Sequence, residues 1–213
     1  MKPFDVRKSK YSIDLILDNF GLERGTNCNV LQSFVQVSIP PDFVLPDLIE
    51  EQRQLLEKEG DLWNEEELKM HFLSFVFKFS DIQVPKKIKL FYERPLAGIV
   101  QDTSLSVICD ALLAAPLGIN TPKTPYFFLQ EFKKGKKAQN DAEGQMLVAM
   151  LIAQEQNKNG HPIYGCYLQG GFWYFATLLN QNYCLSKAYD ATQIKPLIQI
   201  IHILKNLKNI VVL

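Results

Sequence analysis

Charged side chains interrupt two apolar stretches of this chain. Asp110 lies within the apolar run 107–112, and Glu131 and Lys133 lie at the end of the aromatic-rich stretch 126–133. Burying an unpaired charge costs roughly several kcal/mol, so charged residues at core positions indicate a function. Residues two apart on a strand share a face, which turns Glu131 and Lys133 the same way. If the two stretches form neighbouring strands, we expect two carboxylates and one ammonium to converge.

These groups match the chemistry of metal-assisted phosphodiester hydrolysis. Asp110 and Glu131 would provide two oxygen ligands, and the backbone carbonyl of Phe132 a third. Mg²⁺, or Mn²⁺ in its place, suits such a site, because Mg²⁺ takes one or two protein carboxylates and fills its shell with water and substrate phosphate. Lys133 can orient the attacking water or offset the charge that develops on the phosphate. The residues therefore predict metal-dependent hydrolysis of phosphodiester bonds, the reaction of a nuclease.

A strand-rich pattern from residue 86 onward would position these residues. Three strands are expected first, then a helix, then a hairpin with a glycine turn, and last a helix with Pro196 in its first turn. The ranges are 87–91 with 98–101 as a continuation or a turn, 105–113, 126–133, helix 142–156, strands 163–168 and 172–179, a further strand within 183–189, and helix 192–208. This order predicts an α/β fold with a central mixed sheet flanked by helices.

The first sixty residues follow a different pattern. Residues 10–20 have helical spacing, residues 29–39 are expected to be extended, and residues 47–59 form a polar helix. A further helix should begin with Asn64 as its N-cap, since three glutamates fill the first turn. We therefore divide the chain into an N-terminal extension (1–60) that packs on the main domain, and a nuclease-like α/β domain (61–213).

Composition limits the function classes. The 213 residues include 23 Lys plus Arg and 23 Asp plus Glu, and the zero net charge argues against a protein that coats nucleic acid through many basic residues. The four cysteines form no C-x-x-C pair, and we expect them to be reduced and mostly buried. No uncharged apolar run reaches the ~18 residues of a membrane span. We expect a cytoplasmic protein with no membrane contact.

The arrangement resembles the PD-(D/E)XK nuclease superfamily. Asp110 on one strand, Glu131-Phe132-Lys133 ending the next, and Gln145 on the following helix match its motif, and the resemblance covers residues 65–190. The hairpin at 163–175 is similar to that of type I restriction subunits and related bacterial proteins. The resemblance implies a restriction-endonuclease-like fold and a metal-dependent nuclease that acts on DNA, and it adds Gln145 to Asp110, Glu131 and Lys133 as a catalytic-site residue.

The resemblance also implies an acidic residue on the helix before the first strand. Glu66 and Glu67 are the candidates, and we favour Glu67 as a further metal ligand because it lies four residues from His71 on one helix face. The sequence departs from the family at Cys109, where proline commonly precedes the aspartate. Basic residues that follow the motif, Lys134, Lys136 and Lys137, contact nucleic-acid phosphates in this interpretation, or else form a solvated turn.

Two other interpretations stay open. The fold could serve as a catalytically inactive nucleic-acid-binding or assembly module, with Asp110, Glu131 and Lys133 as a structural salt bridge. The chain could instead be a structural α/β protein that oligomerises through its apolar C-terminal helix. A homodimer is compatible with the nuclease interpretation, because many enzymes that cut both strands work as dimers.

Overall fold

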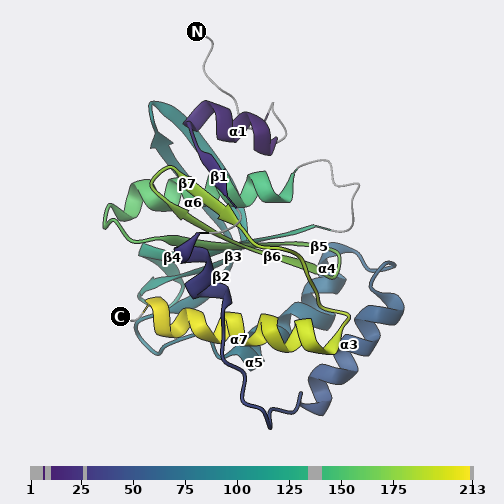
Figure 1. The fold of residues 1–213 in the computed structure, drawn as a ribbon. Coiled ribbons are helices and arrows are strands. Elements are labelled where there is room, and N and C mark those ends of the chain that lie inside the picture. Colours follow the sequence, from purple (N-terminus) through teal and green to yellow (C-terminus); the bar gives the residue numbers. More distant parts are fainter. Residues whose placement is uncertain (1–6, 8–10, 26–27, 134–140, 212–213) are drawn as a thin grey trace.

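The computed structural model of the chain describes residues 7, 11–25, 28–133 and 141–211, with the side chains of residues 128–130 and 133 set aside. Its centre is a mixed β-sheet between two helical layers (Figure 1). Across the sheet the strands run β1 (Glu23–Gly25), β7 (Asn182–Leu185), β6 (Phe172–Leu179), β5 (Ile163–Gln169), β4 (Thr121–Lys133), β3 (Thr103–Leu117) and β2 (Lys89–Val100), and β8 (Tyr189–Asp190) pairs with β6. The predicted α/β architecture with a central mixed sheet is confirmed.

Each face of the sheet has its own hydrophobic core. The first core lies under α2 (Asn29–Val35), α3 (Asp47–Glu59), α4 (Glu65–Leu68), the π-helical turn η1 (Lys69–Leu73), α5 (Ser74–Ser80) and α7 (Ile194–Val211). The second core lies under α1 (Ile13–Phe20) and α6 (Ala142–Asn157). Among the helices that the structure describes, none has the length and apolar character needed to cross a membrane.

Helix α6 connects two parallel strands and lies close to the sheet. Strands β2, β3 and β4 form an antiparallel meander, whereas β4 and β5 run parallel and need a crossover, which α6 supplies. A Cβ at Gly165 of β5 would lie 2.7 Å from the sulfur of Met150 and 2.9 Å from that of Met146. Gly165 therefore permits the close approach of α6 to β5.

Two expectations about local structure were wrong. Residues 29–39 were expected to be extended, but residues 29–35 form α2. Leu31 and Phe34, three residues apart, bury one face of this helix in the first core, and Asn206 of α7 donates to the carbonyls of Ser33 and Phe34. Packing against α7 thus outweighs the weak helix propensity of this segment.

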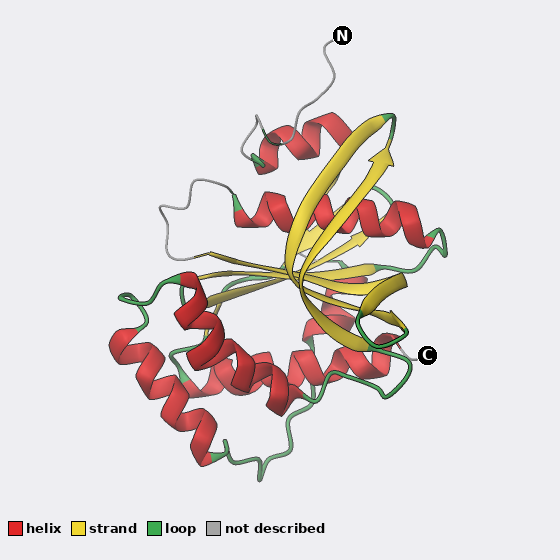
Figure 2. Ribbon diagram, turned by 180° about the vertical axis from the view of Figure 1, so that it is seen from behind, coloured by secondary structure: helices red, strands yellow, loops and turns green. Residues whose placement is uncertain are grey.

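Strand β2 was expected to be interrupted at Glu93-Arg94-Pro95, yet it continues through them. Strand β2 is an edge strand of the sheet, and a proline on the outer side of an edge strand removes no ladder hydrogen bond. The resulting hairpin of β2 and β3 is long and extends along α6 to the level of α1 (Figure 2). At its tip, Gln101 donates to the carbonyl of Phe20, 3.3 Å away.

The cysteines are not all reduced in the structure. Cys28, at the start of α2, is disulfide-bonded to Cys184 of β7, whereas Cys109 and Cys166 are free and buried. The pairing of β1 with β7 brings the two bonded cysteines together, because Gly25 is the register partner of Cys184. The prediction of four reduced thiols is therefore wrong. Reduced cysteines no longer support the prediction of a cytoplasmic location.

The C-terminal helix packs within the molecule. Ile201, Leu204 and Leu207 of α7 are at most 1% exposed and belong to the first core. The apolar stripe that suggested oligomerisation is therefore used inside the fold.

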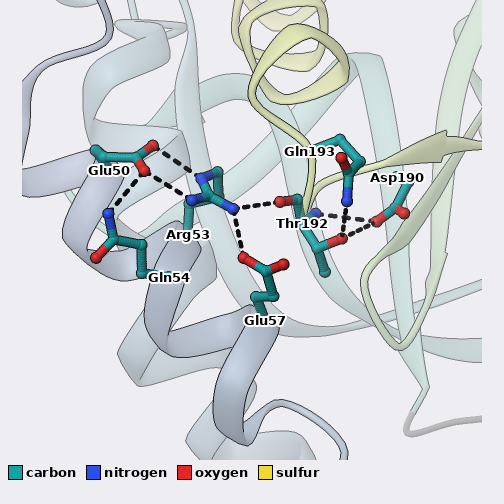
Figure 3. A network of polar contacts seen from close by, with 7 residues as sticks. All are labelled: Glu50, Arg53, Gln54, Glu57, Asp190, Thr192 and Gln193. Carbon is teal, nitrogen blue, oxygen red and sulfur yellow. Dashed lines mark hydrogen bonds and ion pairs between the residues drawn. The ribbon is translucent and has the colours of Figure 1, made fainter.

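A buried arginine connects the N-terminal segment to the end of the sheet. Arg53 of α3 is 9% exposed, forms ion pairs with Glu50 (2.7 Å) and Glu57 (2.8 Å), and donates to the carbonyl of Thr192 (Figure 3). Asp190 in turn accepts from the backbone N–H and the hydroxyl of Thr192. The hydrogen bond from Arg53 lowers the pKa of Glu50 to about 2.

Replacement of this arginine should destabilise the fold. We expect Arg53→Met to lower the free energy of unfolding by about 1–3 kcal/mol, because two carboxylates and a carbonyl lose their donor. Urea denaturation measures the change, with the exposed Lys58→Met on the same helix as the matched control.

The difference between wild type and Arg53→Met should depend on pH. The folded-state pKa of Glu50 lies below its ordinary value of 4.5, so its stabilisation is present above pH 4.5 and is lost as the pH falls toward 2. A difference that stayed constant over this range would contradict the assigned ion pair.

The cysteine assignment predicts a thiol count. After denaturation without reductant, a maleimide reagent should label two of the four cysteines, Cys109 and Cys166, and all four after reduction. Mass spectrometry gives the count, and four labels without reductant would show that Cys28 and Cys184 are not bonded.

Candidate functional site at the fork of β3 and β4

The sheet divides into a fork at the predicted site. Strands β3 and β4 pair up to Ala111 and Gln130, and beyond this pair β3 continues beside β2 while β4 continues beside β5. Asp110 and Glu131 are the first residues past the last pair of β3 and β4. The two stretches that carry the predicted acids are thus neighbouring strands, and the acids lie where these strands separate.

Asp110 joins the two arms of the fork. Its Oδ2 accepts a hydrogen bond of 2.7 Å from the backbone N–H of Phe132, and its Oδ1 lies 3.5 Å from Nζ of Lys69. The residue is 6% exposed. The N–H and C=O of one residue in a strand point to the same side, so the carbonyl of Phe132 also faces the fork.

Lys69 is a cation beside Asp110, and it was not predicted from the sequence. Its Nζ lies 2.7 Å from Glu93 and 3.2 Å from both Glu65 and Glu66. Burial acts to lower the pKa of Lys69, but the surrounding carboxylates, Glu93 first, outweigh this effect and raise the pKa. Lys69 is therefore an ammonium at neutral pH, and it does not serve as a base.

Two backbone irregularities bring these groups together. Lys69 begins the π-helical turn η1, a feature that often marks functional sites. Glu93 has a left-handed backbone, with φ of 50°. At the same level of the sheet, the side chains of β3 change sides, since Cys109 packs in the second core and Ala111 in the first. On a regular strand these two residues would share a face.

Glu131 is more deeply buried than Asp110. It is 1% exposed, and its neighbour Phe132 packs in the first core while its register partner Tyr167 packs in the second. The Glu131 side chain is therefore on the α6 side. Burial raises the pKa of the Cys109 thiol well above its ordinary value, and the charges of Glu131 and Asp110 raise it further. Both acids thus lie within electrostatic reach of one thiol.

Asp110, Glu131 and the carbonyl of Phe132 are oxygen donors of the kind that Mg²⁺ takes, although Glu131 lies on the α6 side and Asp110 contacts Lys69 of the other helical layer. No three His, Cys, Asp or Glu side chains form a metal-binding group among the described residues. Two carboxylates and a backbone carbonyl nevertheless suffice for Mg²⁺, which keeps several waters. The ammonium of Lys69 already stands as a cation against Asp110. A divalent ion at this position would therefore share Asp110 with the ammonium of Lys69.

The other predicted site residues differ in how much of them the structure describes. The backbone of Lys133 is in β4 and pairs with Gln169, while Lys134, Lys136 and Lys137 lie outside the described residues. Gln145 of α6 is half-buried, and its Oε1 has no hydrogen-bond partner in the described part of the chain.

Glu67 has a local structural role. It forms a capping box with Asn64, through a 2.6 Å bond from the Asn64 N–H and a 2.9 Å bond to the Asn64 side chain, and the predicted N-cap is confirmed. The other candidate, Glu66, contacts Lys69 and is thereby connected to Asp110.

A second buried acid lies on the α6 side and has a different environment. Glu143 accepts from Arg24 (3.0 Å), Tyr183 (3.0 Å) and Tyr167 (3.5 Å). Burial raises its pKa, although Arg24 and the tyrosines oppose the shift. These contacts connect α6 to β1, β5 and β7, so Glu143 supports the position of the helix that carries Gln145.

Comparison with known proteins adds no assignment. No family model matches the sequence, and no curated protein matches it.

The hydrogen bond of Asp110 predicts a difference between two variants. Asp110→Ala removes the acceptor of a buried N–H and should cost about 1–3 kcal/mol of unfolding free energy. Asp110→Asn keeps an oxygen for Phe132 and should cost less. Chemical denaturation compares them, and equal losses would show that this hydrogen bond contributes nothing to stability.

Proposed function

We propose that the protein is a metal-dependent nuclease that hydrolyses DNA phosphodiester bonds, with a restriction-endonuclease-like fold. The observation that carries the proposal is the fork itself, where Asp110 and Glu131 follow the last pair of two neighbouring strands. The order of elements also supports it, because β4 ends in Glu131-Phe132-Lys133 and leads into the helix that carries Gln145.

Asp110, Glu131 and the carbonyl of Phe132 would hold Mg²⁺ or Mn²⁺, which when bound supplies Lewis acidity at the phosphate. Asp110 is held for this role by the backbone of Phe132, so one carboxylate oxygen is fixed and the other faces a cation. Lys133 would orient the attacking water or offset the phosphate charge. Gln145 offers a buried amide oxygen near the start of α6.

Substrate contact would come from the segment that follows β4. Lys134, Lys136 and Lys137 supply positive charge next to the motif in the sequence, which suits contact with DNA phosphates. A homodimer would bring two forks to the two strands of a duplex.

Plasmid cleavage tests the proposal. We expect wild-type protein to nick or linearise plasmid DNA with Mg²⁺ or Mn²⁺ and not with EDTA. Asp110→Asn, Glu131→Gln and Lys133→Met should each reduce the rate at least ~100-fold, the scale of losing a group that stabilises the transition state. Lys58→Met, on the exposed side of α3, is the matched control and should cleave like wild type. Equal cleavage by all proteins would indicate a contaminating nuclease and reject the proposal.

A catalytically inactive nucleic-acid-binding or assembly module is the second candidate, and a specific observation favours it. Asp110 and Glu131 are 6% and 1% exposed, and both oxygens of Asp110 have partners in the fold. Isothermal titration calorimetry with Mn²⁺ separates the candidates. Metal binding that disappears in Asp110→Asn supports the nuclease, whereas DNA binding without such metal binding supports the module.

A further inference from the structure

We propose that Lys69 sets the divalent-cation affinity of the fork, because its ammonium is a built-in counter-cation of Asp110 against which a metal ion must bind. The inference rests on the proposed function, since it concerns the same metal site. It makes Lys69 a positioning residue that acts through Asp110.

The contact distances show how the ammonium is held. Three acids, Glu93, Glu65 and Glu66, lie 2.7–3.2 Å from Nζ, whereas Asp110 lies 3.5 Å away. Of the four carboxylates that contact this ammonium in the described part of the chain, Asp110 is therefore the most distant. A metal ion can take Asp110 while the other three acids keep Lys69 in place.

The position of Lys69 is fixed from several elements. Glu65 and Glu66 come from α4, Glu93 from β2 and Asp110 from β3, and the ring of Phe132 from β4 lies 5.7 Å below the ammonium. The Lys69 side chain is 16% exposed, so solvent screens its charge only in part. A cation that is held this firmly stays beside Asp110 when a second cation arrives.

The consequence is a repulsion with a definite sign. A divalent ion on Oδ1 of Asp110 would lie within a few ångströms of a fixed positive charge, and like charges at that separation oppose each other strongly away from bulk water. Removal of the Lys69 charge should therefore tighten metal binding, although the same change removes an ion pair. A purely structural lysine would give the opposite result, since its loss would loosen Asp110 and weaken any site built on it.

Calorimetry with MnCl₂ on the full chain tests the inference. We expect Lys69→Met to bind Mn²⁺ at least ~10-fold more tightly than wild type. Lys69→Arg keeps the charge and should not show the gain in affinity of the neutral variants. Lys58→Met is the matched control lysine, and Lys69→Gln provides a second neutral variant if Lys69→Met does not fold. Circular dichroism and thermal unfolding confirm that each variant is folded.

The double variant Lys69→Met/Asp110→Asn locates the effect. The gain in affinity should vanish in it, because the repulsion acts on a cation at Asp110. A gain that persists, or neutral Lys69 variants that bind as wild type does or more weakly, would overturn the inference.

The failure of the proposed function has a different signature. If Asp110→Asn binds Mn²⁺ as tightly as wild type does, or if no variant binds Mn²⁺, the proposed metal site is rejected, and the inference about Lys69 is rejected with it. If Asp110→Asn abolishes binding while Lys69→Met has no effect, the metal site stands and only the role of Lys69 is rejected.

Discussion

The hydrogen bond from the backbone of Phe132 to Asp110 is the interaction on which the site depends. Where β3 and β4 separate, a buried N–H of β4 loses its strand partner and needs another acceptor. A carboxylate fills that place at 2.7 Å, and Lys69 stabilises its charge from the α4–α5 layer. The open fork, the buried acid and the helical cation therefore form one unit, because each would be costly without the others.

This unit requires strained local geometry. A left-handed backbone at Glu93 costs of order 1–2 kcal/mol, and a π-helical turn replaces regular helix at Lys69. Their side chains form the shortest ion pair of the group, at 2.7 Å. Strain of this kind persists only where surrounding contacts determine it, and such places concentrate at functional sites.

The sequence predicts the helical layers and the central sheet, and it singles out the two acids. It does not predict the side chains that contact them. Asp110 and Glu131 stand out because charge interrupts apolar stretches, and strand pairing then fixes their proximity. Lys69 and Glu93 could not be predicted, since their contact depends on a positive φ and a π turn, which a regular helical or strand period does not encode. The Cys28–Cys184 bond could not be predicted either, because its cysteines are 156 residues apart and are brought together by the pairing of β1 with β7.

Burial alone does not decide between a structural and a catalytic fork. At this fork the ammonium of Lys69 contacts four carboxylates of the described residues. Glu66 and Glu93 are more than half exposed, so water screens much of their charge, but the Asp110 side chain is 9% exposed and water screens it little. A carboxylate that water screens so little is stabilised by a cation beside it, and Lys69 supplies such a cation. Any divalent ion that binds at this carboxylate must therefore do so against the ammonium of Lys69, and the charge of this lysine limits how tightly the fork can hold it.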